Sequence, residues 1–472
     1  MQTITNLLPH QAAAVAKTAP SRIGALFMEM GTGKSRTAIE LVRLRRKRIS
    51  KTIWFCPVSL KQTVKHEILK HTDTRPNEIH IFDHKSNMRT LPEAGWYIVG
   101  IESMSASKRV ILTVNSIVDE KTFVILDESQ YIKGHRSART NWITDISKRA
   151  RYRLILTGTP MSQGIVDLFS QMRFLSPKIL GYRSFYSFAH NHLEYHPNYP
   201  GLIIESHNTE YIAAKIKPYV YQVTKEECLD LPDKLYETRY FEMTWEQREV
   251  YDQAKIDLLM DIDYDHFNSI TIFRLFSALQ QIVSGYRRRK HGEEWQVNYF
   301  IHYRDEMLGG IVSQIPETEK IIIWAKYRYD IDTIKAVLTE CHGENSIALF
   351  HGGINEKGRA DQVMRFRRNA RFFIATPSCG GHGLTLNEAH HVIFYNNSFK
   401  YAERLQAEDR CHRIGQSQPV TYIDIVCAQS IDERIMTALS SKGNVVEAFK
   451  AEVDKVKGEG RKDTIKRMIE TL

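Results

Sequence analysis

The stretch best suited to chemistry lies near the start of the chain, where a glycine-rich turn separates an apolar run from a run with helical spacing. The apolar residues 24–28 lead into Glu-Met-Gly31-Thr32-Gly33-Lys34-Ser35. Glycines let backbone N–H groups approach phosphate oxygens, and the helix that follows offers its positive N-terminal end to the same anion. Lys34 would reach the β- and γ-phosphates of a nucleotide, and the Ser35 hydroxyl would help to hold a magnesium ion. The stretch therefore predicts a strand, a phosphate-binding loop and a helix. The general pattern of such loops begins with glycine where this chain has Met28, so a turn without a ligand stays open as the alternative.

A second candidate is a pair of adjacent acids, Asp127 and Glu128, directly after the apolar run 122–126. Two carboxylates at the end of a buried strand are costly unless a cation meets them. A magnesium-bound nucleotide would supply that cation, with Asp127 in the metal shell and Glu128 positioning and deprotonating the attacking water. The alternative is a strand that runs into an exposed turn.

Three more side chains extend this interpretation. Gln11 lies in an expected helix that starts at Pro9, and its amide can donate to and accept from an adenine edge. Arg410 and Arg413 are three residues apart in an expected helix over 406–416, which places them on one face. Such a pair could enter a γ-phosphate site and stabilise the charge of transfer. Taken alone, all three could equally be solvated surface residues.

The elements that must position these residues alternate between strand and helix. Strands are expected at 24–27, 51–56, 96–100, 122–126 and 153–156, and again at 320–324, 346–350, 371–376 and 390–395. This alternation predicts an α/β fold with parallel sheets, in which ligands bind at the carboxyl ends of the strands. Residues 172–289 have helical spacing instead and are expected to be helical insertions. The turn Leu231-Pro-Asp-Lys234 suggests a boundary between domains at 1–230 and 231–472.

Composition narrows the class of protein. The chain has 472 residues, of which 42% are hydrophobic and 25% charged, as in an ordinary globular protein. Its six cysteines lack paired spacing, which predicts free thiols in a reducing compartment. Its apolar runs are too short for a membrane span and the start of the chain has no signal-peptide pattern, so no membrane association is expected. The net charge of +10 favours a polyanionic partner.

With these residues in view, the chain resembles the superfamily-2 helicase-like ATPases, and within them the Swi/Snf group of DNA translocases. Residues 30–35 resemble helicase motif I, and Asp127-Glu-Ser-Gln130 resembles the DEAH-like motif II. Thr157-Gly-Thr159-Pro resembles motif III, and residues 406–416 resemble motif VI. The motifs stand in the family's order.

The resemblance implies two RecA-like lobes with helical insertions, ATP and magnesium as cofactors, and site residues by position. The residues expected to contact the nucleotide are Gln11, Gly31, Thr32, Gly33, Lys34, Ser35 and Gly383, and Ser35 and Asp127 are expected to bind magnesium. Catalysis falls to Lys34, Asp127, Glu128, Arg410 and Arg413. The residues expected to contact nucleic acid are Ser59, Ser103, His351, Gly352 and Thr385. Thr157 and Thr159 would relay the nucleotide state to the nucleic acid.

The function that the resemblance implies is ATP-dependent translocation on duplex DNA, without necessarily separating strands. A strand-separating helicase on DNA or RNA and a non-hydrolysing nucleic-acid-binding scaffold are the alternatives. The chain departs from the family at Phe399-Lys-Tyr401 and Leu384-Thr-Leu386, which bears on strand preference and coupling more than on hydrolysis. We expect a monomer in the cytoplasm, nucleoid-associated or in a host cell if phage-derived, rather than in the nucleus. A recruiting protein is not identified by the sequence.

Overall fold

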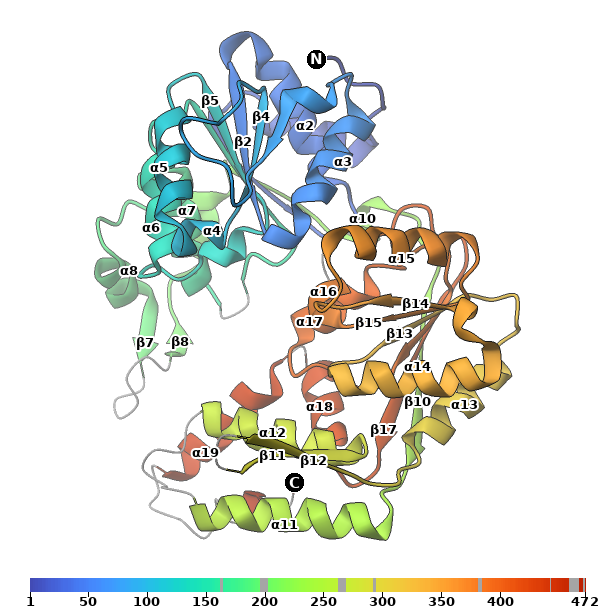
Figure 1. The fold of residues 1–472 in the computed structure, drawn as a ribbon. Helices are drawn as coiled ribbons and strands as arrows, with labels where there is room; N and C mark the ends of the chain where they lie inside the picture. Colours follow the sequence, from blue (N-terminus) through green and yellow to red (C-terminus); the bar gives the residue numbers. More distant parts are fainter. Residues whose placement is uncertain are drawn as a thin grey trace. The chain divides into compact units, whose positions relative to one another are not determined.

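The structure, a computed structural model, describes residues 1–161, 164–195, 203–261, 269–291, 294–380, 384–441, 443–457, 467–469 and 472. These residues form two compact units, Met1–Asp230 and Leu231–Leu472. Each unit is built around one parallel sheet with helices on both faces (Figure 1). The predicted α/β fold class, with parallel sheets in two RecA-like lobes, is confirmed.

The sheet of the first unit has the strand order β3-β4-β2-β5-β6-β1-β9, and all its pairs are parallel. Its strands are β1 (Ile23–Met28), β2 (Lys51–Cys56), β3 (Ile79–Ile81), β4 (Trp96–Gly100), β5 (Thr122–Leu126), β6 (Tyr152–Thr157) and β9 (Val220–Val223). Its helices are α1 (Pro9–Thr18), α2 (Lys34–Arg45), α3 (Lys61–His71), α4 (Ser103–Ala106), α5 (Lys108–Ile117), α6 (Ala138–Ser147), α7 (Val166–Leu175), α8 (Phe185–His192), α9 (Thr209–Ile216) and α10 (Lys225–Cys228). A small hairpin pairs β7 (Leu193–Tyr195) with β8 (Ile203–Ser206).

Strand β1 shows why these segments are apolar without interruption. Ala25 and Phe27 pack in the core on the side of α5 to α8, whereas Leu26 and Met28 pack in the core on the side of α1 to α3. Successive side chains of a strand point to opposite faces, so a strand covered by helices on both sides needs apolar residues at every position. The polar site residues are therefore excluded from the strands and follow their carboxyl ends.

The second unit has a six-stranded parallel sheet with the order β10-β17-β16-β13-β15-β14. Its strands are β10 (Lys234–Phe241), β13 (Ile321–Trp324), β14 (Ile347–Phe350), β15 (Phe372–Ala375), β16 (His391–Phe394) and β17 (Val420–Cys427). Its helices are α11 (Trp245–Asp261), α12 (Ser269–Val283), α13 (Arg304–Gln314), α14 (Arg328–His342), α15 (Glu356–Arg368), α16 (Pro377–Gly380), α17 (Tyr401–Glu408), α18 (Ile431–Ser440) and α19 (Val445–Lys457). A hairpin joins β11 (Tyr286–His291) to β12 (Glu294–Tyr299).

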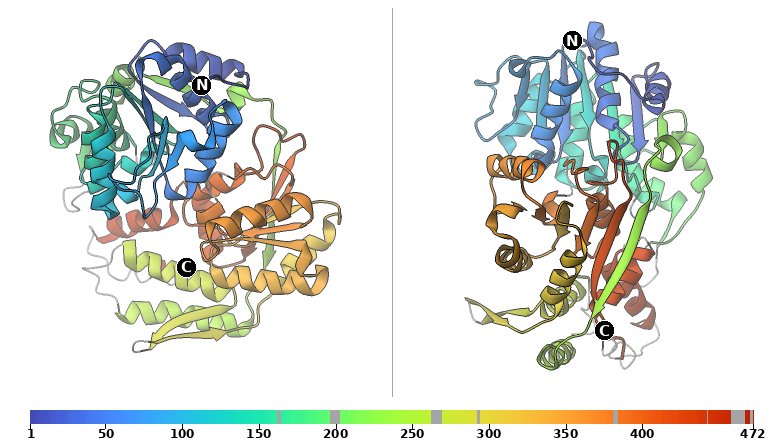
Figure 2. Two further views of the ribbon diagram at one scale, coloured as in Figure 1. Left: turned by 45° about the horizontal axis from the view of Figure 1, so that its top comes forward. Right: turned by 90° about the vertical axis from the view of Figure 1, so that its right-hand side faces the viewer.

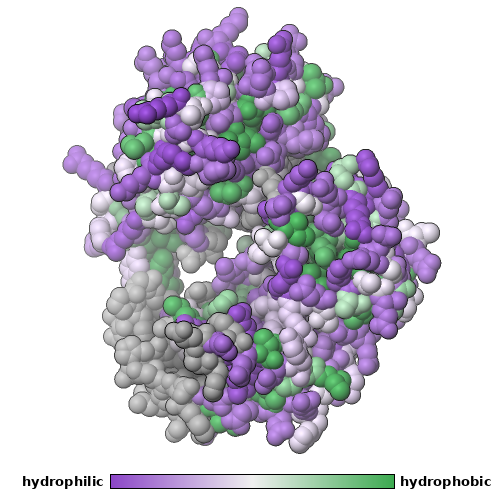
Figure 3. All heavy atoms as spheres, in the orientation of Figure 1, coloured by the Kyte–Doolittle hydropathy of each residue, from purple (hydrophilic) through white to green (hydrophobic). Residues whose placement is uncertain are grey.

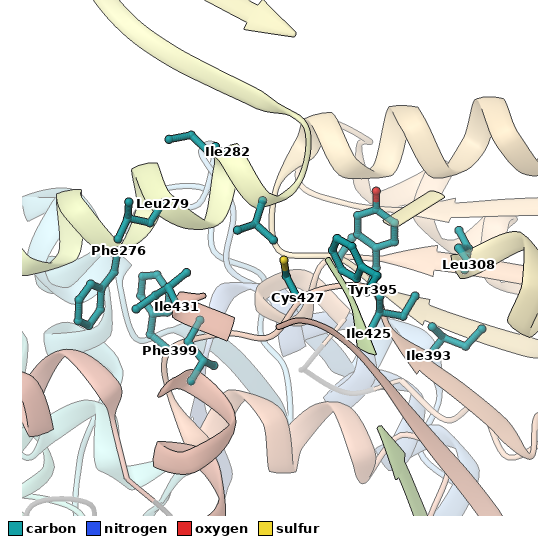
Figure 4. Close-up of a cluster of buried hydrophobic side chains, with 14 of the residues drawn as sticks. Phe276, Leu279, Ile282, Leu308, Ile393, Tyr395, Phe399, Ile425, Cys427 and Ile431 are labelled. Atoms are coloured by element: carbon teal, nitrogen blue, oxygen red, sulfur yellow. The ribbon is translucent and has the colours of Figure 1, made fainter. Parts of the chain in front are cut away.

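The inserted helix α12 packs onto one face of this second sheet. Its side chains Phe276, Leu279 and Ile282 lie in the same buried cluster as Tyr395 and residues of β16 and β17 (Figure 4). The inserted helix α11 starts directly after Thr244, which forms a capping box with Gln247. Thr244 N donates to Gln247 Oε1 at 3.1 Å, and Gln247 N donates to Thr244 Oγ1 at 3.2 Å.

Two predictions about elements are wrong. The segment 172–289 is not helical throughout, because β9 joins the first sheet beside β1, and β10 joins the second beside β17 along its whole length (Figure 2). The helix expected over 406–416 ends at Glu408, and the residues after it form a turn. Within the described residues, no helix combines the length and the apolar character needed to span a bilayer.

Candidate functional site

The phosphate loop lies between β1 and α2, as predicted. Gly31 and Gly33 have φ angles of 84° and 88°, in the left-handed region that glycine tolerates best. A Cβ atom at Gly33 would lie 2.1 Å from Gln11 Nε2, so the close approach of α1 to the loop also requires glycine there. The loop ends at the N-terminus of the 12-residue helix α2, which starts with Lys34 and Ser35. Unbonded N–H groups and the helix dipole make this end suited to an anion.

Lys34 folds its side chain over the loop that precedes it. Its Nζ donates to the carbonyl oxygens of Met28 at 2.8 Å and Glu29 at 3.2 Å. The ammonium group is therefore held at the mouth of the loop, at the end of β1. This is where the sequence predicts contact with the terminal phosphates of a nucleotide.

Helix α1 braces the same loop with two side chains. Gln11 Nε2 donates to the carbonyl oxygen of Thr32 at 3.1 Å, and Gln11 Oε1 accepts from Leu8 N at 3.1 Å. His10 Nε2 lies 2.7 Å from the same Thr32 oxygen, which can only accept, so this nitrogen carries the proton. Both side chains are buried. Gln11 thus lies against the loop, whereas its contact with adenine stays a prediction.

The two acids follow β5 and are buried in the same unit. Glu128 N donates to Asp127 Oδ1 at 2.9 Å, and Glu128 adopts a φ of 48°, an unusual backbone conformation for a residue other than glycine. Burial and the neighbouring Glu128 raise the pKa of Asp127 to about 7, while Lys34 acts in the opposite direction. Lys34 and the acid pair are therefore close enough to interact electrostatically.

Asp127 and Ser35 offer the oxygen ligands that magnesium prefers. A divalent cation beside the buried carboxylate of Asp127 would compensate the charge that burial disfavours. The residues present therefore fit the ion that the sequence predicts.

A chain of hydrogen bonds connects Glu128 with Thr157 and Thr159 at the end of β6. Gln130 Nε2 donates to Glu128 Oε2 at 2.8 Å, and Thr157 Oγ1 donates to Gln130 Oε1 at 2.8 Å. Thr159 N in turn donates to Thr157 Oγ1 at 3.0 Å. Gln130 is the connecting residue, although no separate role was predicted for it from the sequence.

A second connection between these segments was missed by sequence reasoning. Ser129 Oγ donates to Gln171 Oε1 at 2.5 Å, and Gln171 Nε2 donates to the carbonyl oxygens of Pro160 at 2.7 Å and Asp167 at 2.9 Å. Gln171 is fully buried. A buried amide needs partners, but the sequence signal was weak because α7 also carries Asp167, Ser170 and Arg173.

The first pair of predicted nucleic-acid contacts lies at adjacent strand ends in this unit. Ser59 is exposed in the turn after β2, and Ser103 is half-buried at the start of α4 after β4. The two segments are joined because Val58 N donates to Glu102 Oε2 at 3.0 Å. Since β2 and β4 are parallel neighbours, both serines lie at one edge of the sheet.

In the second unit, Arg410 and Arg413 converge although no helix holds them. Arg410 Nη1 and Arg413 Nη1 donate to the carbonyl oxygen of Leu384, at 3.2 Å and 2.9 Å. The prediction that helical spacing aligns them is wrong, because α17 ends before them. A turn brings the two guanidinium groups together instead.

The remaining predicted residues of the second unit follow β14 and precede β16. His351 Nδ1 accepts from Arg328 Nη1 at 2.7 Å and from Gly353 N at 3.1 Å, beside Gly352. Burial and the charge of Arg328 lower the pKa of His351. The carbonyl oxygen of Thr385 accepts from Arg367 Nη2 at 3.1 Å. Gly383 lies outside the described residues.

The predicted nucleotide and metal residues Gln11 to Ser35, Asp127 and Glu128 thus gather in the first unit. The two arginines gather in the second.

The chain matches the models of two known protein domains and is similar to several known proteins. Residues 14–287 match the SNF2-related domain, and residues 303–415 match the helicase conserved C-terminal domain. A putative ATP-dependent helicase/translocase of Bacillus subtilis, YwqA, is 27% identical over 335 residues, which are 68% of this chain and 34% of that protein. An uncharacterized ATP-dependent helicase of Mycoplasma genitalium, MG018, is 28% identical over 330 residues, 69% of this chain and 30% of its own. The chain thus spans about a third of the length of these relatives.

A solved structure, the Sulfolobus solfataricus SWI2/SNF2 ATPase core in complex with dsDNA, is 21% identical. The match covers 93% of this chain and 92% of that one, with a TM-score of 0.43. The family itself is established by the SNF2-related domain, whose match extends over more than half of the sequence. With its phosphate loop, acid pair and paired arginines in the order described, the chain belongs to the SNF2-related family.

Proposed function

We propose that the chain is an ATPase stimulated by nucleic acid, which uses ATP hydrolysis to translocate on duplex DNA without necessarily separating its strands. The observation that carries the proposal is the arrangement in the first unit. A lysine and a serine begin a helix at a glycine loop, and that lysine acts electrostatically on the buried acid that follows β5. This arrangement suits a nucleoside triphosphate bound with magnesium.

In the proposed reaction, each residue has one task at the phosphates. Lys34 binds the β- and γ-phosphates, and the N–H groups of the loop and α2 bind the remaining phosphate oxygens. Ser35 and Asp127 would hold Mg²⁺, which neutralises charge on the phosphates when it is bound. Glu128 accepts the proton of the attacking water through one carboxylate oxygen. Gln130 bonds Glu128 Oε2 and so orients the group.

The arginines complete the proposed reaction from the second unit. Arg410 and Arg413 present two fixed positive charges that can stabilise the transferring phosphoryl group, a role worth about 10³–10⁵ in rate. Their shared hydrogen-bond acceptor, the carbonyl oxygen of Leu384, keeps the two guanidinium groups close to each other. Hydrolysis would then depend on both units of one chain.

The proposed coupling to nucleic acid runs through the strand ends. The hydrogen-bonded series from Glu128 through Gln130 to Thr157 and Thr159 would report the state of the nucleotide. Ser59 and Ser103 in the first unit, and His351, Gly352 and Thr385 in the second, would contact the phosphate backbone. A net charge of +10 supports a polyanionic partner.

Helix α15 adds to this positive surface. It carries the cations Lys357, Arg359, Arg365, Arg367 and Arg368, and hydrophilic side chains gather over it (Figure 3).

The test is the steady-state rate of ATP hydrolysis with no nucleic acid, single-stranded DNA, duplex DNA and RNA. We expect the largest stimulation by duplex DNA, and no turnover without magnesium. Glu128→Gln should still bind ATP but lose turnover, whereas Glu120→Gln, an exposed acid before the same strand, should behave as wild type. Absence of hydrolysis under all conditions would support a non-hydrolysing scaffold, and stimulation by RNA alone would assign a different substrate.

A further inference from the structure

The turn that carries the two arginines is hydrogen-bonded to the segment that connects the two units. We call residues 409–416 the arginine turn and residues 231–233, at the start of the second unit, the connecting segment. His412 lies between Arg410 and Arg413, and its Nε2 is 2.7 Å from the carbonyl oxygen of Pro232. A carbonyl oxygen only accepts, so His412 Nε2 carries the proton and donates it.

A second attachment lies at the end of α17, just before the arginine turn. Lys234 Nζ lies 2.9 Å from Glu408 Oε2 and 3.9 Å from Asp409 Oδ1. Tyr236 donates from its hydroxyl to Glu408 Oε2 at 2.9 Å. Lys234 and Tyr236 are the first and third residues of β10, the strand into which the connecting segment leads. The chain therefore holds the arginine turn with both its backbone and its side chains as it enters the second unit.

The opposite side of the arginine turn is hydrogen-bonded to residues 386–389, which precede β16. Gln416 Nε2 donates to the carbonyl oxygen of Ala389 at 3.1 Å, and Gln416 Oε1 accepts from Ser417 N at 3.0 Å. Leu386 N donates to the carbonyl oxygen of Arg410 at 2.9 Å. The turn is thus attached to the segment before β16 on one side and to the connecting segment on the other. A displacement of the connecting segment would act on the arginines through His412.

We infer that His412 is a positioning residue, which couples the connecting segment to the geometry of Arg410 and Arg413. This inference rests on the proposed role of these arginines in ATP hydrolysis. His412 itself touches neither phosphate nor water in this account. It acts by holding the backbone between the arginines against the carbonyl group of Pro232, so that movement of the connection changes where the guanidinium groups lie.

The test compares His412→Ala with His412→Gln in the whole chain, with ATP hydrolysis measured at saturating duplex DNA. Glutamine places a donor nitrogen as many bonds from Cα as His Nε2, so it can keep the bond to Pro232. We expect kcat to fall about 10- to 100-fold for His412→Ala, as for a catalytic group displaced by about an ångström, with little change in KM. His412→Gln should recover most of the activity. In a chain that already carries Arg413→Ala, His412→Ala should cause little further loss.

Lys234→Met tests the second attachment and replaces His412→Ala if that variant fails to fold. It should lower kcat in the same direction while the protein remains folded by circular dichroism. Equal kcat for wild type and both variants would overturn the inference. So would equal losses for His412→Ala in the presence and absence of Arg413.

A readout without ATP separates this inference from the proposed function. Amide hydrogen exchange should be faster in residues 409–416 of His412→Ala than of wild type, and close to wild type in His412→Gln. If wild type does not hydrolyse ATP, the proposed function fails while the exchange measurement still reports whether the attachment holds. Unchanged exchange in His412→Ala would overturn the attachment itself.

Discussion

Asp127 shows how a residue placed for a cation affects the protein when no cation is bound. Its pKa is raised to about 7 by burial and by Glu128, so the folded chain holds a proton that the unfolded chain releases near pH 4. The contribution of Asp127 to the free energy of unfolding is therefore fully present below its pKa in the unfolded chain. It is lost as the pH rises through its pKa in the folded chain.

We therefore predict that Asp127→Asn is more stable than wild type at pH 8, without nucleotide and magnesium, by about 2–4 kcal/mol. The two proteins should converge near pH 4, because asparagine imitates the protonated acid. Urea unfolding at several pH values measures the difference. Burial also raises the pKa of Asp330 in the second unit to about 7. The pH dependence of the free energy of unfolding that Asp330 causes is therefore the same in wild type and variant. Parallel stability curves for the two proteins would contradict the assignment.

Gln171 carries a second prediction at the scale of single residues. Gln171→Leu leaves the Ser129 hydroxyl and the Pro160 carbonyl without this partner, although the volume is nearly kept. We expect stability to fall by about 1–3 kcal/mol and duplex-stimulated kcat to fall about tenfold because the acid pair is held less firmly. Ser129→Ala is the matched control, since it removes one of the same bonds from the other side. Losses that simply add in the double variant would show that the two residues act separately.

The candidate site could be predicted from residue types and spacing where its members directly follow apolar strands. Lys34, Asp127 and Glu128 lie where the order of strand, loop and helix requires them. Gln171 could not be found in this way, because it bonds to a serine 42 residues away and only the packing of α7 brings them together. His10 was missed beside Gln11 because a histidine at a helix start has no distinctive pattern.

At the scale of elements, α17 illustrates how buried ion pairs attach a short helix to a neighbouring strand of the sheet. Arg404 Nε lies 2.8 Å from Glu408 Oε1, and Arg404 Nη2 lies 3.0 Å from Asp424 Oδ2 on β17, with all three residues buried. Burial alone would raise the pKa of Glu408, but Arg404 and Lys234 hold it below its usual range. The Glu408 carboxyl is therefore ionised, and removing one of its positively charged partners should lower the free energy of unfolding substantially.

We predict that Arg404→Met destabilises the protein by about 3–5 kcal/mol, because it leaves buried carboxylates without their partner. Arg434→Met is the control, since Arg434 pairs with the exposed Glu452 at 3.4 Å and should cost less than about 1 kcal/mol. Denaturant unfolding measures both. Adding Asp424→Asn to Arg404→Met should recover part of the loss. A cost for Arg404→Met as small as that of the control would contradict the prediction.

The elements that sequence reasoning missed share a physical cause. Strands β9 and β10 each lie at an edge of a sheet, so they are covered less completely and lack a continuous apolar run. Tyr236 and Tyr240 of β10 are 58% and 59% exposed, which removes the pattern by which a buried strand is identified. The helix expected over 406–416 ends at Glu408, and the residues after it form a turn in which Gly415 has a φ of 97° and Gln416 bonds back to the chain before β16.

At the scale of the whole molecule, repetition of strand and helix was enough to predict two parallel α/β units. It works because fully buried strands must be apolar and because ligand-binding residues follow their carboxyl ends. The paired arginines and the phosphate loop lie in different units, so sequence alone relates them only through the family. The proposed function requires both to act on a single triphosphate.

The most direct test of that claim is a triplex-displacement assay, in which a third strand is bound to duplex DNA and must be removed by a protein that moves along it. We predict displacement by wild type with ATP and magnesium, none with a non-hydrolysable ATP analogue, and none by Glu128→Gln or Arg413→Ala. The same protein should leave a plain duplex intact. Separation of the plain duplex, or hydrolysis of ATP on duplex DNA without displacement of the third strand, would contradict the account.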